Sequence, residues 1–269
     1  ISLFKETKKV NVRVVLTGQH KEMVDQVMNF FEIKSDLDLN IMKKTQSLEH
    51  ITNNVITGIS EELKKNKSNL LIVQGDTSTA FSAALAAFYN NVPIGHIEAG
   101  LRSNDLYDPF PEEANRRLIS QISELHFAPT KLSKENLLKN GIYKNVFITG
   151  NTVIDALLKV STTVENFTNS KFNPYKQTLI LTTIHRRENW GERLEDILKA
   201  ITIILDQFKN VVFLIPLHKN RIVRDPIIKI LGNKKRVLLV EPLNYSEMVS
   251  VIKASKMLLT DSGGLQEEA

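Results

Sequence analysis

Short apolar runs alternate with amphipathic segments along the whole chain. Runs such as Leu70–Val73 and Val211–Pro216 are typical of strands buried on both faces of a sheet. In the segment 48–65, apolar residues from Ile51 to Leu63 recur every three to four positions, which predicts a helix. Buried strands that alternate with helices predict an α/β protein with parallel sheets.

The alternation is interrupted once. Residues 166–176 are polar and contain Pro174, which is the composition of a linker. The sequence therefore predicts two α/β domains, 1–165 and 177–269, each with one parallel sheet, facing each other across a cleft.

The predicted elements follow from the same pattern. The first domain has predicted strands at Val12–Thr17, Leu70–Val73, Val92–Gly95, Leu125–Ala128 and Val146–Thr149, and an extended segment at Asp36–Met42. Its predicted helices are Ile1–Lys9, Lys21–Phe31, Leu48–Lys65, Ser78–Tyr89, one opened by Pro111, Ser133–Asn140 and one that starts at Thr152. The second domain has predicted strands at Thr178–Thr183, Val211–Pro216, Val237–Val240 and Met257–Thr260, and helices at Leu194–Phe208, Asn220–Leu231 and Ser246–Ala254.

Polar residues without a packing role follow two strands of the first domain. Asp76 comes after one strand, His96 and Glu98 after the next, and Glu112 opens the following helix. Ligands bind parallel sheets beyond the carboxyl ends of the strands, so we expect these residues to line one crevice. Three carboxylates that converge there indicate acid–base chemistry.

The same carboxylates also have structural interpretations. Glu112 and Glu113 each precede an arginine by four residues, and such exposed helix pairs contribute only ~0.3–0.5 kcal/mol. Asp76 or Ser78 could cap the helix that follows. Spacing alone leaves both interpretations open.

Two histidines follow strands of the second domain. His185, with Arg186 beside it, comes after one strand, and His218 after the next. We expect His185 to be functional because it would face the carboxylates across the cleft. The segment 261–264 is a strand–loop–helix junction whose backbone N–H groups suit a phosphate.

Composition narrows the class of protein. Of 269 residues, 42% are apolar and 24% charged, which is typical of a soluble globular protein. The chain has no cysteine, no bilayer-length apolar run and no export signal at Ile1–Lys5, which predicts the cytoplasm. The net charge of +5 suits an anionic substrate, but the lysines are dispersed, so we expect neither a nucleic-acid nor a membrane partner.

Six segments of the sequence carry a family resemblance. In chain order they are Gly75–Thr77, His96–Arg102, Pro111–Arg116, Gly150–Asp155, His185–Asn189 and Asp261–Glu268. Over essentially the whole chain they resemble the bacterial non-hydrolysing UDP-N-acetylglucosamine 2-epimerases. The resemblance implies two Rossmann-like domains of the GT-B type with the nucleotide sugar between them. It also implies interconversion of UDP-N-acetylglucosamine and UDP-N-acetylmannosamine for surface polysaccharide synthesis, with no metal or nicotinamide cofactor.

The resemblance further implies a mechanism. Such enzymes eliminate UDP across C1–C2 to leave a 2-acetamidoglucal, then add UDP back with the proton on the other face of C2. Asp76, Glu98 and Glu112 match the acid–base residues, and His185 matches the group that contacts the diphosphate or assists its departure. The matching substrate ligands are Ser262, Gly263 and Gly264 for phosphate, Glu268 for the ribose hydroxyls, and Arg186 and Arg102 for phosphate or a carboxylate.

An activator site and a homodimer also follow from the resemblance. Some members bind a second UDP-N-acetylglucosamine as activator, and Gln19, His20, Gln46 and His218 fall where that site would be. Thr45 stands where the resemblance leads us to expect an arginine.

The ends of the chain depart from the family pattern. A first strand with a Gly-Thr-Arg-Pro-Glu loop and the last helices are absent, so we expect a fragment with weak or no turnover. Three other functions stay open: a hydrolysing epimerase that releases N-acetylmannosamine and UDP, a GT-B glycosyltransferase, and a non-catalytic nucleotide-sugar binding module.

Overall fold

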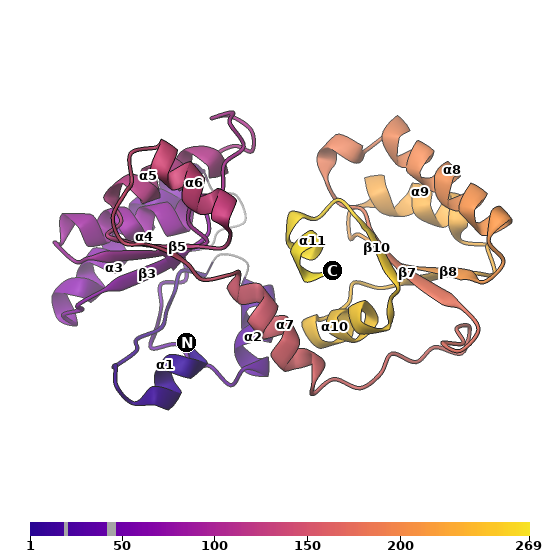
Figure 1. Cartoon of the computed structure of the whole chain (residues 1–269), viewed down its shortest axis with the longest axis horizontal. Helices are drawn as coiled ribbons and strands as arrows, with labels where there is room; N and C mark the ends of the chain where they lie inside the picture. Colours follow the sequence, from indigo (N-terminus) through magenta and orange to yellow (C-terminus); the bar gives the residue numbers. More distant parts are fainter. Residues whose placement is uncertain (19–20, 42–46) are drawn as a thin grey trace. The chain divides into compact units, whose positions relative to one another are not determined.

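The chain forms two compact units. The computed structural model describes residues 1–18, 21–41 and 47–269, and the units are Ile1–Asn151 and Thr152–Ala269 (Figure 1). Each unit contains a parallel four-stranded sheet. The domain limits drawn from the sequence, with a linker at 166–176, lie later in the chain and stay a prediction.

The sheet of the first unit has the strand order β3-β4-β5-β6. Its strands are β3 Leu71–Gln74, β4 Ile94–Ile97, β5 Leu125–Ala128 and β6 Val146–Ile148. Successive strands are connected by α4 Ser78–Tyr89, α5 Glu112–Ile122 and α6 Lys131–Lys139. Because all four strands are parallel, their carboxyl ends lie at one edge of the sheet, where polar loops can meet.

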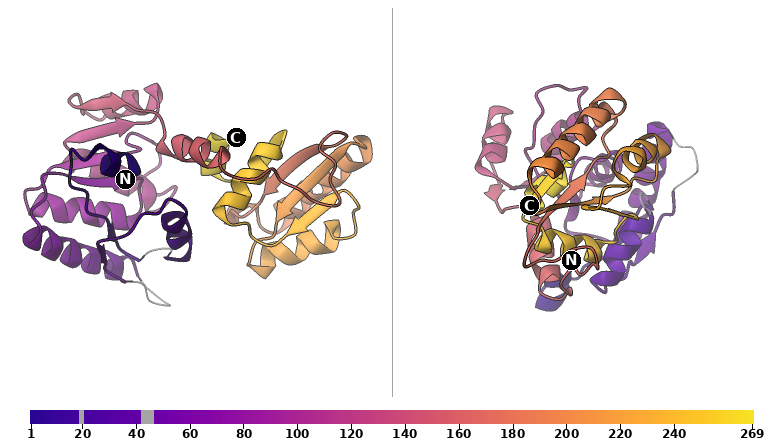
Figure 2. Two further views of the ribbon diagram at one scale, coloured as in Figure 1. Left: turned by 90° about the horizontal axis from the view of Figure 1, so that it is seen from below. Right: turned by 90° about the vertical axis from the view of Figure 1, so that its right-hand side faces the viewer.

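Helices α3 (Leu48–Lys65) and α4 cover one face of this sheet and lie side by side (Figure 2). Both helices have the limits predicted from the sequence. The apolar stripe of α3 from Ile51 to Leu63 is buried. Five buried alanines between Ala80 and Ala87 let α4 approach its neighbours closely.

The N-terminal segment contributes short elements: α1 Ser2–Thr7, β1 Val15–Leu16, α2 Lys21–Phe30 and β2 Leu37–Asp38. Strands β1 and β2 pair only with each other among the described residues. The strand predicted at 12–17 is therefore too long, as is the extended segment predicted at 36–42. The pairing of β1 with β2 starts only at Val15, because the N–H of Val14 donates to the Asp36 carboxylate at 2.7 Å.

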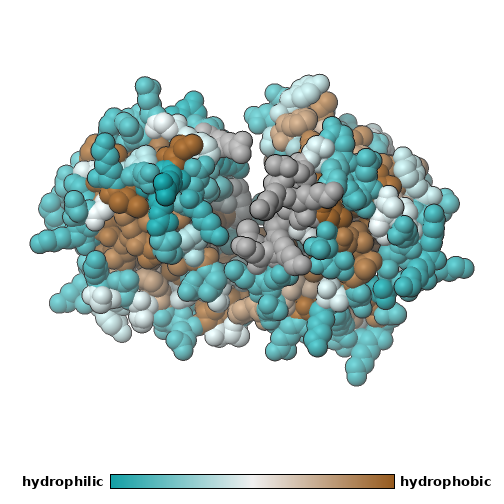
Figure 3. Space-filling view, turned by 180° about the vertical axis from the view of Figure 1, so that it is seen from behind, coloured by the Kyte–Doolittle hydropathy of each residue, from teal (hydrophilic) through white to brown (hydrophobic). Residues whose placement is uncertain are grey.

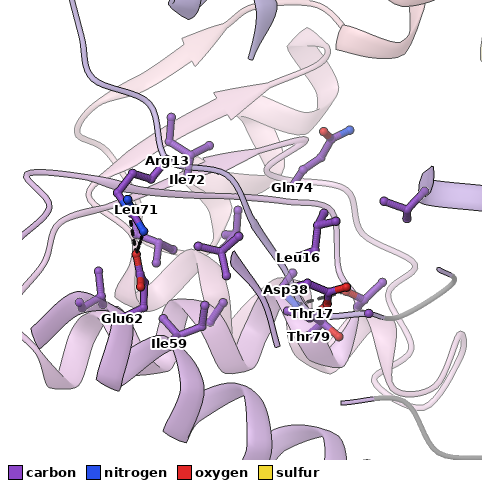
Figure 4. Close-up of a pocket in the computed structure, with 18 of the residues that line it drawn as sticks. Arg13, Leu16, Thr17, Asp38, Ile59, Glu62, Leu71, Ile72, Gln74 and Thr79 are labelled. Carbon is purple, nitrogen blue, oxygen red and sulfur yellow. Dashed lines mark hydrogen bonds and ion pairs between the residues drawn. The ribbon is translucent and has the colours of Figure 1, made fainter. Parts of the chain in front are cut away.

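A cavity of about 350 Å³ lies between β1 and β3, above α3 and α4. Arg13 pairs with Glu62 at one end, and Thr17 and Thr79 lie toward the other (Figure 4). The edge of β3 that faces the cavity has no strand partner among the described residues.

The second unit has the strand order β10-β7-β8-β9. Its strands, β7 Thr178–Thr183, β8 Val211–Pro216, β9 Val237–Val240 and β10 Met257–Thr260, have the predicted limits. Its helices are α7 Thr152–Ser161, α8 Glu192–Gln207, α9 Arg221–Leu231, α10 Tyr245–Ala254 and α11 Gly263–Glu268, with a 3₁₀ turn at Arg187–Asn189. Separate apolar clusters cover the two faces of this sheet, which is why its strands are nearly continuous apolar runs.

Apolar side chains also reach the surface. On the face drawn in Figure 3, brown apolar patches interrupt the teal polar surface on both units. Across the described residues, no helix has the length and apolar character needed to cross a bilayer.

Candidate active site

The ends of β3 and β4 bring the first two candidate carboxylates into one neighbourhood. Gly75 and Glu98 both adopt left-handed backbone conformations, with φ of +72° and +68°. A Cβ atom on Gly75 would lie 3.5 Å from Oε2 of Glu98. The Glu98 carboxylate therefore lies against the backbone that leads directly into Asp76.

Asp76 is held by two residues of α5. Arg116 donates from Nε and Nη2 to Oδ2 of Asp76, each at 2.7 Å. Asn115 donates from Nδ2 to the Asp76 carbonyl at 2.8 Å. Among the described residues, Oδ1 of Asp76 has no partner, so one carboxylate oxygen stays available for chemistry.

A second, buried carboxylate, that of Glu113, pairs with the same Arg116 that holds Asp76. Glu113 is fully buried and accepts hydrogen bonds from Arg116 at 3.1 Å, Arg117 at 2.8 Å and the N–H of Ser103 at 3.1 Å. Burial alone would raise the pKa of Glu113, but the hydrogen bonds from Arg117, Ser103 and Arg116 outweigh it and lower the pKa. The interpretation of Glu113 as half of an exposed helix pair is therefore wrong.

Glu112 is the first residue of α5 and is partly exposed. It makes no ion pair with Arg116, which turns instead to Asp76 and Glu113. Within the described part of the chain its carboxylate has no hydrogen bond or ion pair. Glu112 and Arg116 lie one turn apart on one face of α5.

Thr77 caps α4, because its hydroxyl accepts the Ala80 N–H at 3.2 Å. The alternative that Asp76 or Ser78 caps this helix is therefore wrong. Asp76 has no capping role, so its structural contacts are the ion pair with Arg116 and the hydrogen bond from Asn115 to its carbonyl.

Two further residues of the segment His96–Arg102 turn away from the surface of the first unit. Arg102 donates to the Leu101 carbonyl at 2.7 Å and to Ser120 at 3.4 Å, and burial lowers its pKa. His96, which we expected along the crevice, is fully buried, and its Nε2 lies 2.8 Å from the Gly75 carbonyl. The role of Arg102 as a substrate ligand stays a prediction.

In the second unit, Asp261 organises the loop after β7. Its carboxylate accepts the backbone N–H of His185 at 3.0 Å and of Arg186 at 2.9 Å, and Nδ2 of Asn189 at 2.9 Å. Burial would raise the pKa of Asp261, but these donors together lower it. Nδ1 of His185 lies 2.7 Å from Oδ1 of Asp261, so Nδ1–H donates and Nε2 is the nitrogen left for a ligand.

The predicted phosphate ligands lie around the start of α11. Ser262 caps this helix by accepting the Leu265 N–H at 3.3 Å. A Cβ atom on Gly263 would lie 3.6 Å from Nη2 of Arg186, so that guanidinium and the glycine backbone are neighbours. Burial raises the pKa of the Glu268 carboxyl at the end of the helix.

Of the four predicted activator residues, the structure describes His218. His218 follows β8 and accepts the Asn220 N–H at its Nδ1, 3.0 Å away. Gln19, His20 and Gln46 lie outside the described residues.

Sequence reasoning missed four residues that hold these candidates: Asn115, Arg116, Asn189 and Asp261. All four lie inside the motif segments, but their partners lie in other segments of the chain. The signal available in the sequence was the presence of polar side chains beside the candidates; it did not indicate which contacts these side chains make.

Comparison with known proteins identifies one family. The family described as UDP-N-acetylglucosamine 2-epimerase matches residues 3–269. The UDP-N-acetylglucosamine 2-epimerase of Neisseria meningitidis is 47% identical over 268 residues, covering 97% of this chain and 72% of that protein. The Bacillus subtilis enzyme of the same name is 44% identical over 268 residues, covering 98% of this chain and 70% of that protein.

Solved structures agree. The crystal structure of the Neisseria meningitidis UDP-GlcNAc 2-epimerase bound to UDP-GlcNAc superposes with a TM-score of 0.85 at 45% identity. The superposition covers 97% of this chain and 72% of the Neisseria meningitidis chain. The predicted fold class, Rossmann-like α/β of the GT-B type, is confirmed.

Proposed function

Because this chain belongs to the UDP-N-acetylglucosamine 2-epimerase family, we propose that it converts UDP-N-acetylglucosamine reversibly into UDP-N-acetylmannosamine. The observation that carries this proposal is the carboxylate set at the carboxyl edge of the β3–β6 sheet. Asp76 is held there by Arg116 with one oxygen available, Glu98 lies against Gly75, and Glu112 has no partner among the described residues.

The reaction needs proton transfer at a carbon that no carbonyl activates. In the proposed elimination, a carboxylate takes the C2 proton, the C1–O bond breaks and UDP leaves, which forms 2-acetamidoglucal. In the return step, UDP bonds to C1 again and a second carboxyl delivers a proton to the other face of C2. Asp76, Glu98 and Glu112 are the proposed proton carriers, and each positioned group is typically worth ~10²–10⁴ in rate.

The second unit supplies the proposed nucleotide ligands. Asp261 orients His185 so that Nε2 is left to contact the diphosphate or assist its departure. Ser262, the amides of Gly263 and Gly264, and Arg186 are the proposed phosphate ligands. Glu268 is the proposed ribose ligand.

Four finer parts of the proposal follow from the resemblance: the non-hydrolysing outcome, a second UDP-N-acetylglucosamine as activator, a homodimer, and a role in polysaccharide synthesis. The proposed cytoplasmic location follows from the composition of the sequence. The solved relative bound to UDP-GlcNAc supports a nucleotide-sugar ligand.

The test is incubation with UDP-N-acetylglucosamine in D₂O, followed by proton NMR. We expect UDP-N-acetylmannosamine with deuterium at C2, formed at the low rate predicted from the sequence, and a further loss of ~10²–10⁴ in rate for Asp76→Asn. Glu135→Gln, on the exposed side of α6, is the control and should keep the wild-type rate. Free N-acetylmannosamine with UDP would indicate hydrolysis instead, and no deuterium at C2 after long incubation would overturn the proposal for this chain.

A further inference from the structure

His96 is a buried polar residue directly behind the candidate carboxylates. Its side chain has no exposed surface, so it cannot touch a substrate. Its Nε2 lies 2.8 Å from the carbonyl oxygen of Gly75, which is a hydrogen-bond distance. A carbonyl only accepts, so Nε2 carries the proton and donates it.

Gly75, the residue that His96 contacts, has an unusual backbone conformation. Its φ is +72°, which residues other than glycine rarely adopt. The N–H of Gly75 donates to the Ile97 carbonyl at 3.1 Å. Strand β4 therefore holds the Gly75 residue on both sides, through the Ile97 carbonyl and through the His96 ring. The next residue along the chain is Asp76.

The same strand end also carries Glu98, two residues after His96. Its carboxylate lies against Gly75, as the 3.5 Å distance to a Cβ placed there shows. The hydrogen bond from His96 thus connects the strand that presents Glu98 with the turn that presents Asp76.

The ring stays neutral under ordinary conditions. Burial lowers the pKa of His96 to about 4, with smaller opposing and reinforcing effects from its neighbours. Its Nδ1 has no hydrogen-bond partner within the described structure. A neutral ring with one engaged donor suits a structural link and not a proton carrier.

We propose that His96 is a positioning residue that holds Asp76 in place relative to Glu98 through the Gly75 carbonyl. The inference rests on the proposed function for its effect on rate, but the positioning itself can be measured without turnover. A change of about 1 Å in a reacting group can cost roughly 10²-fold in rate, so this hydrogen bond affects kcat more than KM.

The chain offers a matched control in His126. It is the direct cross-strand neighbour of His96 on β5, it is also almost fully buried, and burial also lowers its pKa. Of these two histidines, His96 hydrogen-bonds to the backbone of Gly75 and His126 to the backbone of Ser123. Replacing either ring by phenylalanine makes a similar change in buried volume, so the Gly75 contact distinguishes the two variants.

The experiment compares His96→Phe, His96→Gln and His126→Phe by amide hydrogen exchange of residues 73–77 and by steady-state kinetics. We expect exchange in this segment to rise roughly tenfold in His96→Phe relative to His126→Phe. We expect kcat to fall roughly 10–100-fold in His96→Phe with KM within about threefold. His96→Gln keeps an N–H donor and should recover part of both effects.

Equal exchange in the two phenylalanine variants would overturn the inference, as would a kcat that His96→Phe leaves unchanged. If the wild-type chain shows no turnover, the proposed function fails, and exchange alone then decides whether His96 positions Asp76. If His96→Phe does not fold, His96→Leu against His126→Leu carries the same comparison, because leucine has no donor for the Gly75 carbonyl.

Discussion

The candidate carboxylates of the first unit are supported by a buried charge network, whereas the candidate phosphate ligands His185 and Arg186 of the second unit are about half exposed. Glu113 is fully buried beneath Asp76 and Arg116. The side chains of His185 and Arg186 are 45% and 50% exposed. A proton-transfer group gains from being held in one geometry, while ligands for a charged diphosphate gain from accessibility.

The largest expected effect comes from removing the buried carboxylate. Glu113→Gln removes the negative charge that pairs with both Arg116 and Arg117. Breaking a buried ion pair typically costs ~3–5 kcal/mol. We expect this loss in urea unfolding followed by hydrogen exchange of α5. Glu112→Gln is the control and should change stability by less than about 0.5 kcal/mol. Similar losses in both variants would contradict a supporting role specific to Glu113.

The second unit has one comparable centre, Asp261. Asp261→Ala removes an ionised acceptor from His185, Arg186 and Asn189, and hydrogen bonds to charged groups contribute about 1.5–3 kcal/mol. We expect a loss of about 2–3 kcal/mol in urea unfolding followed by the fluorescence of Trp190, the only tryptophan. The matched change Glu188→Ala, at an exposed pair, should have little effect; equal losses would show that Asp261 has no special role.

Acid should weaken the first unit through its buried histidine. The unfolded chain binds a proton at His96 near pH 6.5, whereas the folded chain binds it only near pH 4. Between these values the unfolded state holds more protons, so stability falls as the pH falls, by about 2 kcal/mol from pH 7 to pH 5. His96→Gln should flatten the dependence of the unfolding free energy on pH. An unchanged slope would contradict the low pKa of His96.

The smallest effect concerns the cap beside Asp76. Thr77→Ala removes the hydroxyl that accepts the Ala80 N–H, and loss of an N-cap typically costs ~1 kcal/mol. Thr77→Ser keeps the oxygen and should keep most of the stability of α4 in thermal unfolding. A loss as large in Thr77→Ser would indicate that the methyl group, and not the cap, matters.

The two units also differ in how well the sequence predicted them. Every strand of the second sheet has its predicted limits, because both faces are buried and each strand is a continuous apolar run between polar loops. In the first unit, β1 is two residues long where six were predicted. Its length depends on what pairs with it, and local hydrophobicity carries no information about pairing.

The hydrophobic pattern and the motifs predicted the alternation of strands and helices, the two α/β units and the family. The pattern also indicated the candidate carboxylates, because Asp76 and Glu98 follow apolar runs and Glu112 opens a helix. Which of these side chains form ion pairs depends on the three-dimensional fold. Arg116 reaches Asp76 from 40 positions away, and Asp261 reaches His185 from 76 positions away. Such partners are set by how helices pack on the sheet, so the buried network and the inward turn of His96 could not be derived from spacing.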